Sequence, residues 1–346
     1  HTNFNCKKEG GFYTQEQLKE LVAFARERFI EIMPEIDMPG HMLSAIACYK
    51  ELTCFERNHK VASHWGVKHD ILCGGKDITY KFCKDIIDEL CEVFDGQYIH
   101  IGGDEAPKFR WNVCPNCQAK MKSEGLKNTE ELQLYFTNVM ADYIASKGKK
   151  TMMWYEDNEQ PTILKKEIIQ EWWGTNVNKK FEEKIKNGTP IFNANSSAYY
   201  IDLPYGKITL KDSYNAPTEF GEPKSDDGIV GMEACLWTEY VKNLKKAKFN
   251  TFPRFCAITE AMWTPTDKRD YKTFLVKLDT HKSFLKRYNI TLSGANVYNP
   301  NCIRKFFSSA WFEKRQLTWQ GLHFVFDDAK IRRLAKKNAK KAAAQK

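Results

Sequence analysis

The stretch YIHIGGDEAP, residues 98–107, contains an apolar run that leads into two glycines and then two adjacent carboxylates. Its first half has the character of a buried strand, and the glycines permit a tight turn where that strand ends. Adjacent like charges repel each other in a partly buried place, so the position of Asp104 and Glu105 indicates a functional site. We therefore expect a strand over residues 98–103 that ends in a chemically active pair.

The same alternation of strand and helix recurs on both sides of this stretch. Apolar residues at helical spacing are clearest in residues 78–94 and 131–148. Thr14 and Gln17 predict a capping box at the start of a helix, and Gly148 predicts the end of another. Alternating strands and helices predict a parallel sheet covered by helices. Six strands are predicted, at residues 30–36, 98–103, 151–155, 167–172, 190–194 and 229–237.

Charged and aromatic residues gather where successive strands end, and this narrows the fold class. A doubly wound sheet concentrates function at one switch point, whereas a (β/α)8 barrel carries it at the carboxyl ends of many strands. A closed barrel of this type needs eight strands. We therefore predict an α/β fold, a (β/α)8 TIM-type barrel that lacks its first two βα units. The strand-end residues are Glu35, Asp37, His41, Asp104, Glu105, Trp154, Tyr155, Glu156, Asp157, Trp172, Trp173, Trp237 and Glu239.

The composition, 42% hydrophobic and 28% charged residues, indicates a soluble globular protein without a membrane span. Of the net charge of +9, eight basic residues fall within residues 330–346 without an acidic one, which leaves about +1 elsewhere. Such a tail is typical of a solvated chain end, so we expect no nucleic-acid partner; the alternative predicts salt-sensitive binding through the tail. We predict that residues 1–295 form the barrel and residues 296–346 a poorly ordered C-terminal extension.

The eleven cysteines are scattered, and their odd number prevents complete pairing within the chain. Cys114 and Cys117 form the only CxxC, which without a second pair is a weak zinc signal. The favoured interpretation is a loop with two free or locally bridged thiols, and metal or redox chemistry is the alternative. The histidines show no ligand spacing. We expect neither a metal nor a cofactor.

Six motifs in order make the chain resemble glycoside hydrolase family 20, the β-N-acetylhexosaminidases, from about residue 10 to residue 289. The resemblance implies an exo-acting enzyme that removes terminal N-acetylglucosamine or N-acetylgalactosamine from glycans or chitooligosaccharides, in a secreted, periplasmic or lysosomal setting. The family's sugar-binding arginine and aspartate-rich strand end do not appear before residue 10, so a sugar-binding scaffold without turnover is the alternative. The motifs are PEIDMPGH (34–41), HIGGDE (100–105), MMWYED (152–157), QEWWG (170–174), YYID (199–202) and ACLWTE (234–239).

The resemblance also implies roles for individual residues. Family 20 is substrate-assisted, which means that the sugar's own 2-acetamido oxygen attacks the anomeric carbon. Glu105 would be the general acid and later the base, and Asp104 would orient the acetamido group and stabilise its positive charge. His41 could bridge to these carboxylates. The implied substrate-binding residues are His41, Trp154, Trp172, Tyr200, Asp202, Trp237 and Glu239.

These assignments have competing interpretations. GGDE also occurs in nucleotide cyclases, but there a phenylalanine follows, and here alanine and proline follow. An acidic helix N-terminus is the structural alternative for the carboxylate pair, and each tryptophan could belong to the core. Strand alternation lets only one of Trp172 and Trp173 point inward, and we favour Trp172. Glu35 and Asp37 are expected to support the site without touching the substrate.

Overall fold

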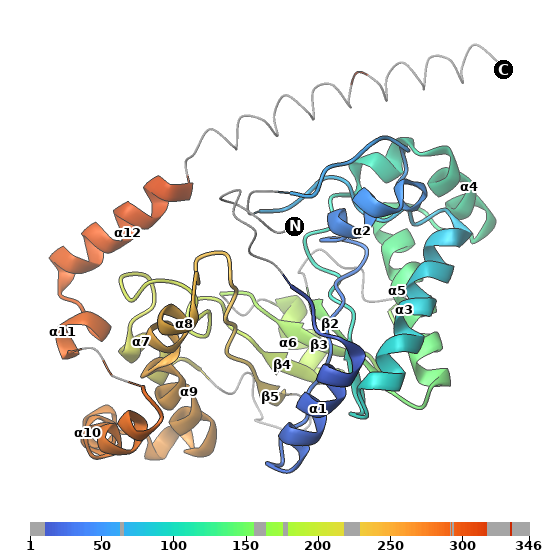
Figure 1. Ribbon diagram of the computed structural model, residues 1–346. Helices are drawn as coiled ribbons and strands as arrows, with labels where there is room; N and C mark the ends of the chain where they lie inside the picture. The colour runs from blue at the N-terminus through green and yellow to red at the C-terminus, as the bar shows by residue number, and fades with distance from the viewer. Residues whose placement is uncertain are drawn as a thin grey trace. The chain divides into compact units, whose positions relative to one another are not determined.

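The structure, a computed structural model, describes residues 11–62, 66–155, 164–175, 179–217, 229–290, 292, 294–316 and 333. The chain divides into two compact units, of which unit 1 comprises residues 1–170 and 324–346 and unit 2 comprises residues 171–323. Each unit has hydrophobic clusters of its own. Figure 1 shows the helices and strands of both units.

Parallel strands in chain order form the sheet, as the sequence predicts. The strands are β1 (Tyr98–His100), β2 (Lys150–Tyr155), β3 (Ile169–Trp172), β4 (Ile191–Asn193) and β5 (Ile229–Met232), in the order β1-β2-β3-β4-β5. β1 pairs with β2 with His100 opposite Met152, and β4 pairs with β5 with Asn193 opposite Met232. Successive parallel neighbours joined through helices are the repeat of a (β/α)8 barrel.

The first predicted strand is present as an extended segment, residues 34–38, beside β1. His100 donates its backbone N–H to the oxygen of Pro34 at 3.0 Å, and Met38 donates to the oxygen of Ile101 at 2.8 Å. Glu35 and His100 form a parallel bridge. All six predicted strand positions are therefore found among the described residues. The register of this segment places its polar residues beside those that follow β1.

Helices connect the strands. In unit 1 they are α1 (Gln15–Arg26), α2 (Leu43–Cys48), α3 (Asp77–Val93), α4 (Pro115–Ser123) and α5 (Thr129–Ser146), with the 3-10 helices η1 (Lys50–Leu52) and η2 (Lys108–Val113). In unit 2 they are α6 (Lys179–Lys186), α7 (Leu210–Asn215), α8 (Leu244–Thr251), α9 (Arg254–Trp263), α10 (Tyr271–Arg287), α11 (Ala295–Tyr298) and α12 (Cys302–Gln316), with η3 (Thr266–Lys268). The capping box of Thr14 and Gln17 is confirmed, and α5 ends just before Gly148, which has a φ of 74°.

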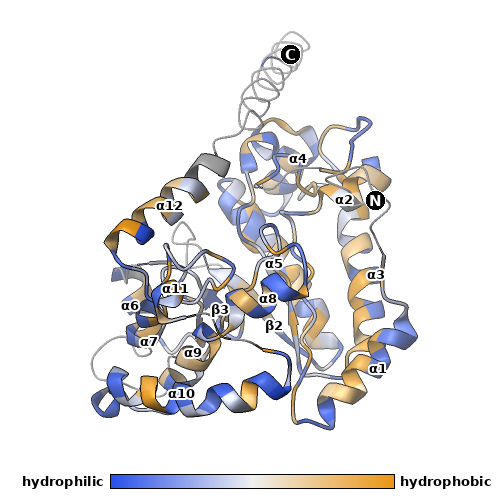
Figure 2. Cartoon of the chain, turned by 60° about the vertical axis from the view of Figure 1, so that its left-hand side comes forward, coloured by the Kyte–Doolittle hydropathy of each residue, from blue (hydrophilic) through white to orange (hydrophobic). Residues whose placement is uncertain are grey.

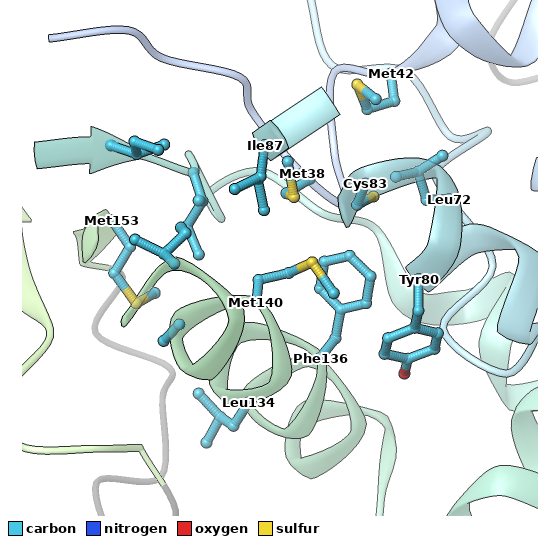
Figure 3. Close-up of a cluster of buried hydrophobic side chains, with 14 of the residues drawn as sticks. Met38, Met42, Leu72, Tyr80, Cys83, Ile87, Leu134, Phe136, Met140 and Met153 are labelled. Carbon is cyan, nitrogen blue, oxygen red and sulfur yellow. The ribbon is translucent and has the colours of Figure 1, made fainter. Parts of the chain in front are cut away.

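The largest core of unit 1 lies between its strands and the helices α3 and α5. Ile87 of α3 and Phe136 and Met140 of α5 are fully buried, and Met153 of β2 belongs to the same cluster (Figure 3). Burial of one such side chain stabilises the fold by about 1.5–3 kcal/mol. This core therefore holds β1 and β2, and the loops at their ends, in place.

Unit 2 has a second core formed by α7, α9 and α10. Tyr214, Ala257, Phe274 and Leu278 are buried in it. In Figure 2, α10 carries both hydrophobic and hydrophilic patches along its length, as expected of a helix that packs on one face. The buried side chains of Ala257 in α9 and of Phe274 and Leu278 in α10 thus face this core.

The C-terminal region contains helical structure up to residue 316. Within the predicted extension, α12 forms a helix of 15 residues. The basic tail, residues 330–346, lies outside the described residues except for Arg333, as do Glu156 and Asp157. Among the described residues, the structure contains no helix that is both long and apolar enough to span a membrane.

Candidate active site

Two neighbouring parallel segments of unit 1 end at the same edge and bring four polar side chains together. Residues 34–38 lead into the turn that carries His41, and β1 leads into the turn that carries Asp104 and Glu105. Because parallel strands present their carboxyl ends at one edge, Asp37 and His41 lie beside the predicted carboxylate pair. The structure therefore joins the catalytic candidates to the residues expected to support them.

Gly102 is required at the turn because a carboxylate occupies the space beside it. Its φ is 64°, and a Cβ added there would lie 1.9 Å from Oδ1 of Asp37. Gly103, with a φ of 106°, donates its backbone N–H to the same Asp37 oxygen at 2.9 Å. The side chain of Asp37 therefore fills the space beside Gly102.

Asp37 and Asp104 form a partly buried carboxyl pair. Burial, and then the neighbouring Asp37 carboxylate, raise the pKa of Asp104 to about 8. Burial also raises the pKa of Asp37, although the Gly103 hydrogen bond and the charge of His41 act in the opposite direction. The pair therefore holds a proton at neutral pH. Oδ1 of Asp104 is buried and has no hydrogen-bond partner among the described residues.

His41 is a cation that holds Glu105. Nε2 of His41 lies 3.3 Å from Oε2 of Glu105 and 3.7 Å from Oδ2 of Asp37. The hydrogen bond to Glu105, helped by the charges of Asp37 and Asp104 and opposed by burial, raises the pKa of His41 to about 9. Both partners have left-handed backbones, with φ of 51° at His41 and 46° at Glu105. Such strain in non-glycine residues is typical of functional sites. The predicted bridge from His41 to the carboxylates is thus present.

Glu35 forms a second anchored carboxylate in the same region. Its Oε1 accepts from the indole Nε1 of Trp154 at 2.9 Å and lies 3.2 Å from Nδ1 of His100. Burial acts to raise the pKa of Glu35, but His100, Trp154 and His41 outweigh it and lower the pKa. Trp154 is only 2% exposed, and its ring meets His100 edge-on at 5.2 Å. The indole N–H of Trp154 is thus engaged by protein.

Unit 2 gathers most of the remaining candidates where its own strands end. Tyr200 forms a parallel bridge with Cys235, and its ring lies 6.1 Å from that of Trp237. Asp202 is 4% exposed, and burial raises its pKa to about 6, with the charge of Glu239 adding to the effect. Oδ1 of Asp202 has no hydrogen-bond partner among the described residues. Glu239 is exposed. Within unit 2, therefore, Asp202 offers a buried acceptor and the two aromatic rings offer flat apolar surface.

Trp172 is the more buried of the two adjacent tryptophans, as strand alternation predicts. It is 1% exposed, and its ring centroid lies 4.6 Å from that of Phe181 in α6. A Cβ at Gly174 would lie 2.5 Å from the indole nitrogen of Trp172. Trp173 is partly exposed. Trp172 is therefore packed by protein on at least one face, and its predicted contact with a sugar stays a prediction.

The sequence analysis did not identify the residues that contact the candidate side chains or their backbone and hold them in position. His100 lies on β1 between two core isoleucines and faces Glu35. Its polarity at a buried strand position was the available signal. In unit 2, Asn250 donates to the backbone oxygen of Asp202 at 2.8 Å, and the buried Arg254 donates to the backbone oxygen of Ile201. These helix residues are distant in sequence, so no local pattern reveals them.

Three groups of side chains in the described part of the chain could hold a metal ion. The first, Asp37, His41 and Asp104, already contains an imidazolium that opposes a second cation. The second is Glu171, Glu233 and Cys235 in unit 2. The third is a group of four cysteines in unit 1, outside the carboxylate cluster.

Comparison with known proteins shows the family of the chain. Residues 1–266 match the model of the glycosyl hydrolase family 20 catalytic domain. The chain belongs to this family. Its strand order and the similar solved structures confirm the (β/α)8 barrel class.

Three relatives illustrate the similarity. A beta-hexosaminidase of Porphyromonas gingivalis is 36% identical over 78% of this chain and 36% of its own length. The crystal structure of a beta-N-acetylhexosaminidase aligns with a TM-score of 0.78 and 32% identity, over 84% of this chain and 65% of that one. A mutant beta-hexosaminidase of Streptomyces plicatus in complex with its product GlcNAc aligns with a TM-score of 0.71 and 26% identity, over 85% and 58% of the two chains. This family 20 chain thus spans less than two thirds of each relative.

Proposed function

We propose that this family 20 chain acts as an exo-β-N-acetylhexosaminidase that removes terminal, non-reducing GlcNAc or GalNAc from glycans or chitooligosaccharides. The observation that supports this proposal most directly is that the two adjacent carboxyl groups, of Asp104 and Glu105, have different surroundings. Asp104 has a buried carboxyl oxygen, Oδ1, without a partner among the described residues, whereas the side chain of Glu105 is 40% exposed and contacts His41. This difference supports a role for Asp104 as the acceptor of an amide N–H and for Glu105 as the group that exchanges protons with a leaving group or water.

The reaction follows the substrate-assisted route. The acetamido oxygen attacks the anomeric carbon while Glu105, in its protonated form, donates its proton to the glycosidic oxygen, so that the aglycone leaves as an alcohol. Asp104 accepts the acetamido N–H and stabilises the positive charge of the oxazolinium. Water then attacks the anomeric carbon, Glu105 takes its proton, and the acetamido group is restored with net retention.

The proton shared by Asp37 and Asp104 matters to this route, because Asp104 has to be an anion when the oxazolinium forms. Moving the shared proton to Asp37 frees Asp104 without releasing the proton to solvent. An N–H donor and a developing cation both favour the ionised form of Asp104. Asp37 therefore serves as a positioning residue that also tunes the charge of its neighbour.

The surroundings favour a cationic transition state. The lowered pKa of Glu35 keeps a permanent anion in the same region, and the Asp37–Asp104 pair adds a further negative charge. A preorganised negative potential stabilises an oxocarbenium-like transition state more than the neutral substrate. In unit 2, Asp202 offers a buried acceptor for a sugar hydroxyl. We assign Tyr200 and Trp237 to the acetamido group and the sugar face.

The test is release of 4-nitrophenol from its N-acetyl-β-glucosaminide and N-acetyl-β-galactosaminide by the purified chain. The β-glucoside, which lacks the acetamido nucleophile, is the matched substrate and should not be cleaved. Glu105→Gln should reduce kcat by about 10²–10⁴-fold, the range for a lost general acid and base. Asp85→Asn, on the exposed surface of α3, is the matched control and should leave the rate unchanged.

Two outcomes would count against the proposal. Equal cleavage of the β-glucoside would show that the acetamido group plays no part. Sugar binding by calorimetry without release of 4-nitrophenol, unchanged in Glu105→Gln, would identify a sugar-binding scaffold.

A further inference from the structure

Four cysteines of unit 1 converge away from the carboxylate cluster. Cys54, Cys73, Cys114 and Cys117 place their Sγ atoms within 4.8 Å of one another. Three are fully buried, and Cys54 is partly buried. All four are free thiols. A group of four buried thiols is unusual, because a thiol is only a weak hydrogen-bond donor and acceptor and contact with three other thiols stabilises it little.

The sulfur separations match a tetrahedral metal site. Cys73 lies 3.6 Å from Cys117 and 3.8 Å from Cys114, and Cys54 lies 3.8 Å from Cys117, measured between Sγ atoms. Four thiolates bound tetrahedrally to zinc at about 2.3 Å lie about 3.8 Å from each other. A disulfide requires about 2.05 Å. The arrangement thus already has the ligand spacing of a mononuclear tetrathiolate.

The backbone around the cysteines supports this arrangement. Cys54 and Cys73 each follow one partner of an antiparallel bridge, Thr53 with Leu72, and Cys73 donates its N–H to the oxygen of Leu52 at 2.7 Å. This bridge fixes two of the four sulfur atoms relative to each other. The register brings them to the same side although 19 residues separate them in sequence.

The other two cysteines lie at the start of α4. Cys114 is its N-cap and makes no side-chain capping hydrogen bond to the helix, Pro115 follows, and Cys117 lies in the first turn. The N-terminus of a helix favours negative charge, which suits thiolate ligands placed there. The two loops approach closely at Gly75, where an added Cβ would lie 2.2 Å from the backbone of Asn116. Any side chain at Gly75 would separate the two cysteine pairs.

We propose that Cys54, Cys73, Cys114 and Cys117 bind one structural Zn²⁺ ion as a closed tetrathiolate. Loading releases the four thiol protons to solvent and leaves a centre of charge −2 beside the N-terminus of α4. Four protein ligands leave no open position, so the ion takes no part in chemistry at a substrate. The zinc fastens the segment that carries Cys54 and Cys73 to the loop between β1 and α4.

The two segments that the zinc ion would join are close to the active-site candidates His41 and Glu105. Leu72, next to Cys73, donates its backbone N–H to the oxygen of Pro39 at 3.0 Å, two residues before His41. Glu105 lies in the same β1–α4 loop as Cys114. The site is therefore placed to hold His41 and Glu105 in position. Metal content does not depend on turnover, so the zinc proposal can fail without the proposed function failing, and the reverse also holds.

The experiment measures metal in the chain purified after expression in zinc-supplemented medium. Inductively coupled plasma mass spectrometry should find one zinc per chain in the wild type. Cys73→Ala and Cys114→Ala should lose it, whereas Cys83→Ala, which removes a fully buried thiol of α3 outside the cluster, should retain it.

A second measurement on the wild type keeps the proposal testable if the variants fail to fold. A mercurial reagent should release zinc, detected by a chromogenic chelator, in step with the modification of four thiols. Chain reloaded with Co²⁺ should show the visible bands of tetrahedral cobalt thiolate. Absence of stoichiometric metal, stoichiometric iron in place of zinc, or two disulfides among these cysteines by peptide mass spectrometry would overturn the proposal.

Discussion

Gly102→Ala tests how the carboxylate cluster is built. The new Cβ would lie 1.9 Å from Oδ1 of Asp37, at a backbone φ of 64°. A left-handed alanine costs about 1–2 kcal/mol. Displacement of Asp37 breaks its hydrogen bond from the N–H of Gly103, a bond to a charged group worth about 1.5–3 kcal/mol. The two contributions together predict that the free energy of unfolding falls by about 2.5–5 kcal/mol.

Gly125→Ala is the matched control. Gly125 has nearly the same φ, 68°, but a Cβ there would meet nothing within 4 Å. It should therefore cost only the backbone contribution, about 1–2 kcal/mol. Parallel guanidinium denaturation, followed by circular dichroism, measures the difference between the two variants. Equal destabilisation would refute the reasoning that Asp37 occupies the space beside Gly102.

The remaining predictions concern charge and binding in the two units. Asp37→Asn removes the neighbouring charge that helps to raise the pKa of Asp104, so an NMR titration of the Asp104 carboxyl should show that pKa below about 8; an unchanged value would contradict the paired arrangement. Asp202→Asn removes a charged acceptor worth about 1.5–3 kcal/mol, so kcat/KM should fall about 10–100-fold, while an exposed control, Glu183→Gln, keeps the wild-type value. Because the folded-state pKa of His41 lies near 9 and its unfolded value near 6.5, its contribution to stability is complete below about pH 6.5 and is lost as pH rises through 9. The free energy of unfolding should therefore fall more steeply from pH 6.5 to 9 in the wild type than in His41→Gln, and parallel curves would contradict the ion pair.

Features with a local period or a fixed spacing could be predicted from the sequence. The strands follow from apolar runs that end at polar residues, and the start of α1 follows from the spacing of Thr14 and Gln17. The meeting of His41 with Glu105 could also be expected, because neighbouring parallel strands end at one edge. These features need only the strand order and one register.

Features that depend on long loops could not be predicted. The cysteine group needs the Thr53–Leu72 bridge and the close approach at Gly75, and neither leaves a periodic signal. Cys114 and Cys117 alone therefore looked like an incomplete site. The neighbour of Gly102 could not be predicted for a similar reason, because only the register of residues 34–38 against β1 shows that Asp37 fills that space. Glu35 and Asp37 were expected to support the site. Glu35 accepts a hydrogen bond from Trp154, and Asp37 accepts one from the backbone of Gly103.

The most direct test of the central claim varies the nucleophile in the substrate. In a series of 4-nitrophenyl β-glucosaminides, the N-acetyl group is replaced by its mono-, di- and trifluoro derivatives, which progressively weaken the attacking carbonyl oxygen. Participation by that oxygen, supported by Asp104 and Glu105, predicts that kcat/KM falls at each step. A rate that is independent of fluorination would contradict the account, because the nucleophile would then belong to the protein or to water.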